Sequence, residues 1–539
     1  MLKTRKLLAL TFLVMFMSAF PALAATSIPF TINLSKAVNV TGTPRIAVDV
    51  GGVTRYATYT SGTGTSALIF TYAMVAGDVD LDGVTVSSPI DLNGGTIKDL
   101  AGNDLSPLTF TLPNTSNVKV NYPSLGMDFI YDADGRYTLN GTVYNDFTSF
   151  LTAAGGTFSR SSIGTYFDST GTLQTAASNI PRFDYDPTTL AAKGILIEES
   201  RTNSVQNAEQ VGFIAGTPGT TAGNWIVSPN TANGLTRTIV GTGTLNGIKY
   251  FDIRWAGTST STQAIQMDPQ LPNVSAASSG QTWTGSAYVQ IIAGSIPSPA
   301  NLNITVIERN STSSYLIATS AIIPNVAPWK RYSVSRTFNN AATAYAHLGI
   351  RIDSLNVGTI IDVTIRIAAP QLELGSFATS YIPTTTTAVT RAADILSIPT
   401  GGWYNPTEST VFAQYDVPNK SSIAGVFSLN DGSQNNKTDL RTNGGMITSI
   451  ANINQENQTV AANSSTTNKV SKGIILNNIG GSANGSAVIT DTSVGVPTVN
   501  KLQIGGLDNS ISYGMNGTLQ KLKYYPLRSS NTQLQLLTQ

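Results

Sequence analysis

Short runs of alternating apolar and polar residues recur along the chain, and turn-forming residues separate them. Alternation with a period of two is typical of β-strands that bury one face. Runs with the spacing of an amphipathic helix are almost absent, so the pattern predicts an all-β protein. The strands expected near the N-terminus are Ser27–Leu34, Arg45–Val50, Thr54–Tyr59, Ala67–Tyr72, Val84–Val86 and Leu108–Leu112.

The middle of the chain shows the same alternation in longer runs. Apolar residues make up 41% of the sequence and charged residues only 12%, and there is no cysteine. No disulfide can therefore stabilise the domains, and each must depend on a buried core. The strands expected in this part are Lys249–Trp255, Thr282–Ile292, Leu302–Arg309, Trp329–Phe338 and Ile360–Ile367.

The first 24 residues have the pattern of a secretion signal. Lys3, Arg5 and Lys6 precede the apolar run Leu7–Phe20, and Ala22-Leu23-Ala24 fits a signal-peptidase site. The run is short for a membrane span. We expect residues 1–24 to be removed and the mature chain to be exported, without a membrane span.

The remaining 515 residues are enough for three or four domains. Without the three N-terminal cations, 29 Lys and Arg residues stand against 31 acids. This near-neutral charge argues against a nucleic-acid partner, which would require a basic stripe.

Two phrases characterise residues 25–120: AGDVDLDGVTV at Ala76–Val86 and LNGGTIKDLAGNDLSPLTF at Leu92–Phe110. Together they resemble the bacterial immunoglobulin-like repeats of large surface proteins. The resemblance implies an immunoglobulin-like sandwich that serves as a spacer.

Residues 121–205 contain a segment, Phe158–Asn203, that resembles a stretch common in phage tail and virion-associated proteins. The residues that carry this resemblance are Arg160, Tyr166, Phe167, Asp168, Gly171, Pro181, Arg182, Asp184, Pro187, Gly194, Leu196, Glu198, Arg201 and Asn203.

Two further domains are expected after this block. Residues 206–395 resemble a jelly roll of the carbohydrate-binding-module type, and their last part, Ala369–Leu396, is similar to the end of such modules in phage tails. Residues 396–539 resemble a concanavalin A-like, laminin-G-like domain, on the strength of the segment IGGLDNSISYGMNGTLQKLKYYPLRSSNTQLQLL at Ile504–Leu537. The sequence leaves open whether block 121–205 donates strands to this last domain.

Catalytic patterns are scarce. The sole histidine, His347, lies on an expected strand, where a packed or surface role is favoured, and no G-x-S-x-G motif occurs. No E-x-D-x-x-E pattern brings two carboxylates together for glycoside hydrolysis. Glu198 and Glu199 are adjacent and point to opposite faces of a strand, so we expect Glu198 to pair with Arg201 or Arg182. We expect no enzyme.

A metal site is conceivable in the N-terminal domain. Asp78, Asp80 and Asp82 alternate before Gly83, as in a calcium loop, but Pro89 stands where an EF-hand needs its last ligand. Aspartates in such a loop more often shape a turn by accepting hydrogen bonds from backbone amides. Calcium is therefore kept as an alternative.

A sugar site would combine an aromatic face with amide or carboxylate groups. The aromatic candidates are Trp225, Trp403 and Tyr404, which lie among turn-forming residues, although packing is an equal alternative for them. The polar candidates lie in one loop, LNDGSQNNKTD, for which an ordinary hairpin is favoured; they are Asn430, Asp431, Asn435 and Asn436.

These observations favour an exported, non-catalytic adhesion protein that binds surface glycans, at the cell surface or on a virion. The rival interpretation is a structural stalk, fibre or surface layer that binds no sugar. A homo-oligomer in solution would favour this rival, whereas a monomer with an open aromatic cleft would favour glycan binding. A polysaccharide-degrading enzyme is the third and least favoured reading.

Overall fold

The computed structural model describes residues 26–539 except 131–135, 229–232, 327, 418–423, 434, 443–445, 453, 462–467 and 508–513. Nearly every element in these ranges is an antiparallel strand, so the all-β expectation is confirmed. The expected secretion signal, residues 1–24, lies outside the described residues. In the part of the chain that is described, no helix has both the length and the apolar character needed to cross a membrane.

The N-terminal domain is built on one six-stranded sheet in the order β6-β2-β3-β4-β1-β7. Alternating residues of these strands, such as Phe30, Ile32, Val48 and Phe70, fill its core. The strands are β1 (Ser27–Thr41), β2 (Arg45–Val50), β3 (Val53–Ser61), β4 (Thr65–Ala73), β6 (Thr85–Val86) and β7 (Thr96–Asp99), with β5 (Asp78–Asp80) and β8 (Val120–Tyr122) as a separate pair.

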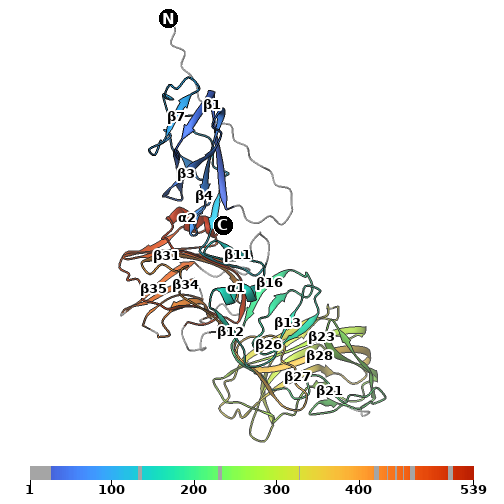
Figure 1. Cartoon of the computed structure of the whole chain (residues 1–539). Coiled ribbons are helices and arrows are strands. Elements are labelled where there is room, and N and C mark those ends of the chain that lie inside the picture. Colours follow the sequence, from blue (N-terminus) through green and yellow to red (C-terminus); the bar gives the residue numbers. More distant parts are fainter. Residues whose placement is uncertain are drawn as a thin grey trace.

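The terminal sandwich, at the centre of Figure 1, consists of two facing sheets. The larger contains β9 (Leu125–Asp128), β10 (Tyr137–Leu139), β11 (Thr142–Tyr144), β15 (Phe183–Tyr185), β16 (Ala192–Ile197), β31 (Glu408–Asp416), β36 (Asn468–Ile475), β37 (Asn478–Ala483), β38 (Ile489–Asp491) and β40 (Gly517–Tyr525). The smaller contains β12 (Thr157–Ser159), β30 (Ile395–Pro399), β32 (Ala424–Asn430), β33 (Lys437–Thr442), β34 (Met446–Asn452), β35 (Asn454–Ala461) and β39 (Lys501–Ile504).

This sandwich is assembled from two distant parts of the chain. Strand β9 pairs with β40, β16 also pairs with β40, and β12 pairs with β30. The block 121–205 thus donates strands to the C-terminal part, which answers the question that the sequence left open. In space, the N-terminal domain, the terminal sandwich and the inserted sandwich follow one another (Figure 1). Along the chain, the inserted sandwich lies between the two parts that form the terminal sandwich.

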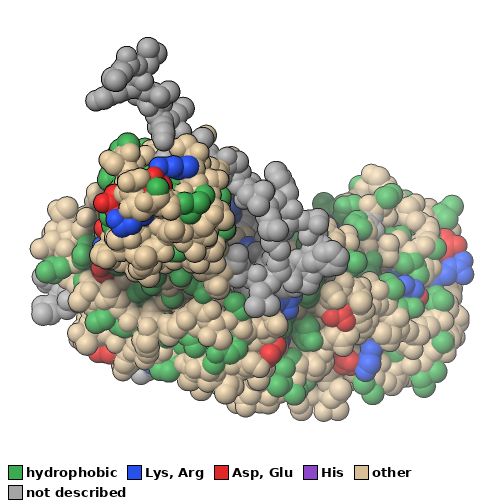
Figure 2. Space-filling model, turned by 45° about the horizontal axis from the view of Figure 1, so that its top comes forward, with side chains coloured by type: hydrophobic (Ala, Val, Ile, Leu, Met, Phe, Trp, Pro, Cys, Tyr) green, Lys and Arg blue, Asp and Glu red, His purple; other side chains and the backbone are tan. Residues whose placement is uncertain are grey.

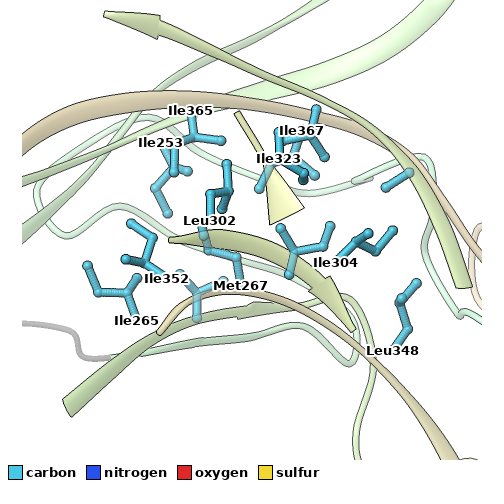
Figure 3. Close-up of a cluster of buried hydrophobic side chains, with 14 of the residues drawn as sticks. Ile253, Ile265, Met267, Leu302, Ile304, Ile323, Leu348, Ile352, Ile365 and Ile367 are labelled. Atoms are coloured by element: carbon cyan, nitrogen blue, oxygen red, sulfur yellow. The ribbon is translucent and has the colours of Figure 1, made fainter. Parts of the chain in front are cut away.

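The inserted sandwich lies between these two parts of the chain. One sheet contains β18 (Ile226–Ser228), β21 (Gln263–Asp268), β22 (Ser275–Ala276), β24 (Leu302–Arg309), β25 (Tyr315–Ile323) and β27 (Tyr345–Leu355). The other contains β19 (Leu235–Leu245), β20 (Ile248–Thr258), β23 (Thr282–Ser295), β26 (Lys330–Thr337) and β28 (Ile360–Leu374). Figure 3 shows how Ile253, Met267, Leu302, Ile304 and Ile365 from the two sheets meet in the core.

Two short antiparallel pairs lie at the boundary between the terminal and the inserted sandwiches. Strand β17 (Arg201–Asn203) pairs with β29 (Val389–Arg391), which places Arg201 opposite Arg391. Strands β13 (Gly164–Phe167) and β14 (Leu173–Ala176) form the second pair. We call this region the neck.

Both described helices are short and capped. Helix α1 (Phe147–Ala153) begins after Asp146, whose carboxylate accepts a hydrogen bond from the Ser149 amide at 2.8 Å. Helix α2 (Asn531–Leu537) begins after Ser530 and lies between the terminal sandwich and the N-terminal domain (Figure 1).

The N-terminal domain is held against the terminal sandwich by specific contacts. The Gln533 side chain of α2 accepts a hydrogen bond from the Leu81 amide at 2.8 Å and donates one to Asp82. Tyr525 donates to Asn121 at 2.6 Å. A Cβ added to Gly77, which has φ +106°, would lie 2.5 Å from Cδ of Pro526, so the backbone approaches closely there.

We predict that Gln533→Ala loosens this contact, because both hydrogen bonds of a buried amide are lost, at about 1–3 kcal/mol. Hydrogen exchange of the Leu81 amide should accelerate about tenfold or more, since 1.4 kcal/mol is a factor of ten. Gln535→Ala is the matched control, because Gln535 donates to the Gly485 carbonyl within the terminal sandwich. Equal Leu81 exchange in the two variants would contradict the prediction.

Candidate binding site at the neck between two sandwiches

Five charged side chains are buried together at the neck, and we call them the neck cluster: Arg160, Arg182, Glu198, Arg391 and Asp394. Asp394 accepts from Arg160 at 2.9 Å through one oxygen and from Arg182 at 2.5 Å through the other. Glu198 pairs with Arg182 at 2.9 Å and with Arg391 at 3.2 Å. Buried charges are tolerated only when they are paired and hydrogen-bonded in this way.

The Glu198 carboxylate has the densest set of partners in this cluster. Its oxygens also accept from the Ser380 amide at 2.7 Å and the Ser380 hydroxyl at 2.6 Å. Burial by itself would raise its pKa, but the attraction of Arg391 and Arg182 and the Ser380 hydrogen bonds outweigh burial. They lower the pKa of Glu198 to about 2, so the group is ionised at neutral pH.

A pocket of about 320 Å³ opens beside the neck cluster, and we call it the junction pocket. Three parts of the chain form it: the segment from β13 to Glu198, the inserted sandwich together with the segment that follows β28, and Asp416 with residues 516–518 of the terminal sandwich. Its lining residues are Thr165, Tyr166, Phe167, Leu173, Asp184, Pro187, Lys193, Leu196, Glu198, Tyr288, Arg331, Phe377, Ala378, Thr379, Ser380, Tyr381, Asp416, Asn516, Gly517 and Thr518.

Aromatic residues from several elements line this pocket. Tyr166 and Phe167 come from β13, Tyr288 from β23, and Phe377 from the exit of the inserted sandwich. The guanidinium of Arg201 lies over the Phe377 ring at 4.9 Å and fixes that ring. Burial raises the pKa of Tyr288, so its hydroxyl is neutral at neutral pH.

Polar groups of the pocket are held in place by the same local structure. Asp184 accepts from the Phe167 amide at 2.9 Å and from Lys193 at 2.7 Å. Arg182 donates to the Thr165 carbonyl at 3.0 Å. Apolar rings with a few fixed polar groups form the usual lining of a small-molecule site. Such a lining can hold the apolar face of a sugar ring and bind its hydroxyl groups.

The aromatic residues predicted from sequence lie elsewhere and are mostly buried. Trp225 is 7% exposed, packs on Phe213 and Phe251, and donates its indole N–H to the Asn207 carbonyl at 3.0 Å. Trp403 is 2% exposed and packs edge-on against Tyr524.

These two indoles therefore offer no face for stacking, and the packing alternative describes both. Tyr404 is half-buried beside Trp403, with 5.8 Å between the ring centroids.

The polar loop predicted from sequence is a hairpin whose groups bond one another. Asp431 accepts from the Ser433 amide at 2.8 Å and from the Asn436 side chain at 3.0 Å. Asn430 is fully buried and accepts from the Gly432 amide at 2.9 Å. Asn435 is exposed. None of these residues lines the junction pocket.

The three aspartates of the N-terminal domain do not fit calcium. Asp78 is paired with Arg55 at 2.6 Å and accepts from the Val75 amide at 2.8 Å. Asp80 accepts from the amides of Gly51 and Gly83, as expected for a turn, and Asp82 accepts from Gln533. Across the described residues no group of three or more His, Cys, Asp or Glu side chains is arranged to hold a metal.

His347 is a packed histidine. Its ring is fully buried, Arg309 donates to its Nδ1 at 2.6 Å, and its Nε2 lies 3.2 Å from Asp268. Burial lowers its pKa despite the attraction of Asp268. The ring is therefore neutral at neutral pH and accepts through Nδ1.

Sequence reasoning did not select the junction pocket, although two of its segments carried a signal. Tyr166, Phe167 and Asp184 lie in the segment Phe158–Asn203, and Phe377 and Tyr381 lie in Ala369–Leu396. Both segments had been singled out by their resemblance to phage-tail proteins. The pairing of Glu198 with Arg182 was expected and is confirmed, whereas Arg201 pairs with Glu199.

No family model and no curated protein matches the sequence. Among solved structures, the chain is similar to the Ruminococcus gnavus IT-sialidase CBM40 bound to α2,3-sialyllactose, with 17% identity over 25% of this chain and 84% of that chain and a TM-score of 0.23. It is also similar to the N-terminal CBM22-1–CBM22-2 tandem domain of Paenibacillus barcinonensis Xyn10C, with 10% identity, 58% and 97% coverage and a TM-score of 0.19.

Domains LG4-5 of the mouse laminin α1 chain match with 11% identity over 53% of this chain and 91% of that chain, at a TM-score of 0.19. Likenesses of this strength carry no argument about the function of the chain. Its all-β class rests on its own strand pairings.

We predict that Glu198→Gln destabilises the protein by about 3–5 kcal/mol, because it leaves Arg182 and Arg391 buried without their shared counter-ion. Glu199→Gln is the matched control. Glu199 pairs with Arg201, but its side chain is 26% exposed, so the loss should be about 1 kcal/mol or less. Denaturant unfolding measures both, and equal losses would refute a special role for Glu198.

Acid should remove the contribution of the ionised Glu198 side chain to the free energy of unfolding. Because the folded-state pKa of Glu198 is lowered from 4.5 to about 2, its contribution is full above pH 4.5 and is lost as the pH falls toward 2. The wild type should therefore lose more unfolding free energy between pH 4.5 and 2 than Glu198→Gln does. Parallel stability curves for the two proteins would contradict this assignment.

Proposed function

We propose that the chain is an exported, non-catalytic adhesion protein that binds surface glycans in the junction pocket. One observation carries the proposal: aromatic side chains and fixed hydrogen-bonding groups from three parts of the chain converge on one cavity. Its volume of about 320 Å³ lies at the lower end of the range for small-molecule sites. That size suits one or two sugar residues of a longer glycan.

The character of the surface supports this kind of partner. Figure 2 shows only scattered charged side chains on the face in view, in keeping with the 12% of charged residues in the sequence. The described part of this face offers hydroxyl and amide groups for neutral contacts and shows no basic stripe of the kind that nucleic acid requires. A single small pocket gives weak binding, which several copies on one surface would strengthen by avidity.

Export is the second part of the proposal and rests on the sequence of residues 1–24 alone. An exported chain without cysteine gains no stability from disulfides. The buried cores of its three bodies and the neck cluster must then supply that stability.

A structural stalk is the rival function, and one observation favours it. The N-terminal domain is fixed to the terminal sandwich through Gln533, Tyr525 and the close approach of Gly77 to Pro526. A spacer that transmits force or sets a distance would need such a rigid connection.

We predict that the protein without residues 1–24 binds selectively on a broad glycan array, and that Tyr166→Ala weakens this binding about tenfold or more through loss of a stacking surface. Tyr315→Ala is the control, because Tyr315 is 60% exposed on β25 and does not line the pocket.

Three results would change the interpretation. A folded protein that binds no glycan would favour the stalk. Binding that Tyr166→Ala leaves unchanged would place the site outside the junction pocket. Loss of binding on addition of a calcium chelator would show that binding needs a metal ion, at a site other than the three aspartates of the N-terminal domain.

A further inference from the structure

Arg331 is the cation through which the inserted sandwich contributes to the junction pocket. It lies near the start of the edge strand β26 and is half-buried. Its guanidinium donates to the Thr379 carbonyl and, at 2.8 Å, to the Ser286 hydroxyl. Both partners are neutral, and both hold the guanidinium in a fixed orientation at the wall of the pocket.

The charge of Arg331 has no carboxylate partner among the described ion pairs, in contrast to its neighbours. Arg182 and Arg391 share Glu198, and Lys193 pairs with Asp184 at 2.7 Å. Nε of Arg331 is also buried without an acceptor in the part of the chain that is described. Nε of Arg182 and Nε of Arg391 are unpaired as well, but each of these two residues already has its counter-ion.

A half-buried guanidinium without a carboxylate partner favours an anionic oxygen as its ligand. Leaving a buried donor without an acceptor costs about 1–3 kcal/mol, and more when the group is charged. A guanidinium is always charged and is planar, so it suits the oxygens of a carboxylate. A ligand carboxylate that reaches the accessible part of the Arg331 guanidinium from the pocket would supply the missing counter-charge.

We propose that the junction pocket selects acidic glycans, and that Arg331 binds the carboxylate of a hexuronic acid residue. This inference rests on the proposed glycan-binding function and names the class of sugar. The aromatic residues that line the pocket hold the face of the sugar.

The remaining charges of the pocket limit how acidic the ligand can be. Three carboxylates also line it, those of Asp184, Glu198 and Asp416, and Lys193 is a second cation that is paired with Asp184 at 2.7 Å. A densely charged polymer, such as a heavily sulfated glycan or a nucleic acid, would be repelled by these carboxylates. A sugar with one carboxylate and several hydroxyl groups fits a pocket in which one of the two cations, Arg331, lacks a carboxylate partner and hydrogen-bond acceptors lie nearby.

Matched sugars test the inference on the unmodified protein. Isothermal titration would compare galacturonic and glucuronic acid oligosaccharides with the same oligosaccharides after reduction of their carboxyl groups to hydroxymethyl groups. The acidic members should bind about 10- to 100-fold more tightly, which is the range of a charge-assisted hydrogen bond. Their affinity should also fall as salt is added.

Substitutions of Arg331 test whether this residue causes the preference for acidic sugars. Arg331→Gln should lose the preference for the acidic member, and Arg331→Lys should keep part of it, since it keeps the charge without the planar edge. Arg254→Gln is the control. Arg254 pairs with Asp362 on an exposed part of the inserted sandwich and does not line the pocket. Each variant is first compared with the wild type in thermal unfolding.

The outcomes separate this inference from the function on which it rests. Equal binding of acidic and reduced sugars, with loss in Tyr166→Ala, would overturn acid selection and leave glycan binding intact. Tighter binding of sulfated than of carboxylated sugars would also overturn it. If no sugar of either kind binds, both proposals fail.

Discussion

The ion pairs buried at the neck are the constraint on which the arrangement of the molecule depends. They join the segment before the inserted sandwich, through Arg160, Arg182 and Glu198, to the segment after it, through Arg391 and Asp394. Each charge is taken out of water, so each is stable only while its partners are present. The two segments are thereby fixed against each other at the point where one sandwich gives way to the next.

The junction pocket inherits its shape from this constraint. Ser380, which binds Glu198, belongs to the wall formed by the exit of the inserted sandwich. Thr165, whose carbonyl accepts from Arg182, belongs to the segment that precedes the inserted sandwich. The ion pairs behind these walls therefore help to hold them in position. A site that is formed before binding loses less conformational entropy when a ligand enters.

The sequence was informative about where strands lie and much less informative about which strands and side chains pair. Alternation identified strands such as Arg45–Val50 and Leu302–Arg309, because the period of two is a local property. The nesting could not be read in this way, because the partners are far apart: Ser124 bonds the Tyr524 carbonyl across 400 residues of chain. Glu198 and Arg182 could be matched from the sequence, since opposite charges that are buried need each other.

The surroundings of single side chains were harder to predict. Trp225 lies among turn-forming residues in the sequence and is nevertheless buried against Phe213 and Phe251. Arg331 gave no signal, because KRYSVSRT looks like any exposed edge strand.

The antiparallel pair of β17 and β29 has a consequence for how the chain can assemble. It brings the two ends of the inserted sandwich side by side, with Arg201 opposite Arg391. Once that body has folded, it no longer acts as a long flexible loop between the halves of the terminal sandwich but as a short rigid link. The entropy of closing the loop between β16 and β30 then falls to that of a few residues. The folded inserted sandwich thus links the two parts of the terminal sandwich. If it folds first during synthesis, it would bring together strands that are far apart in the sequence.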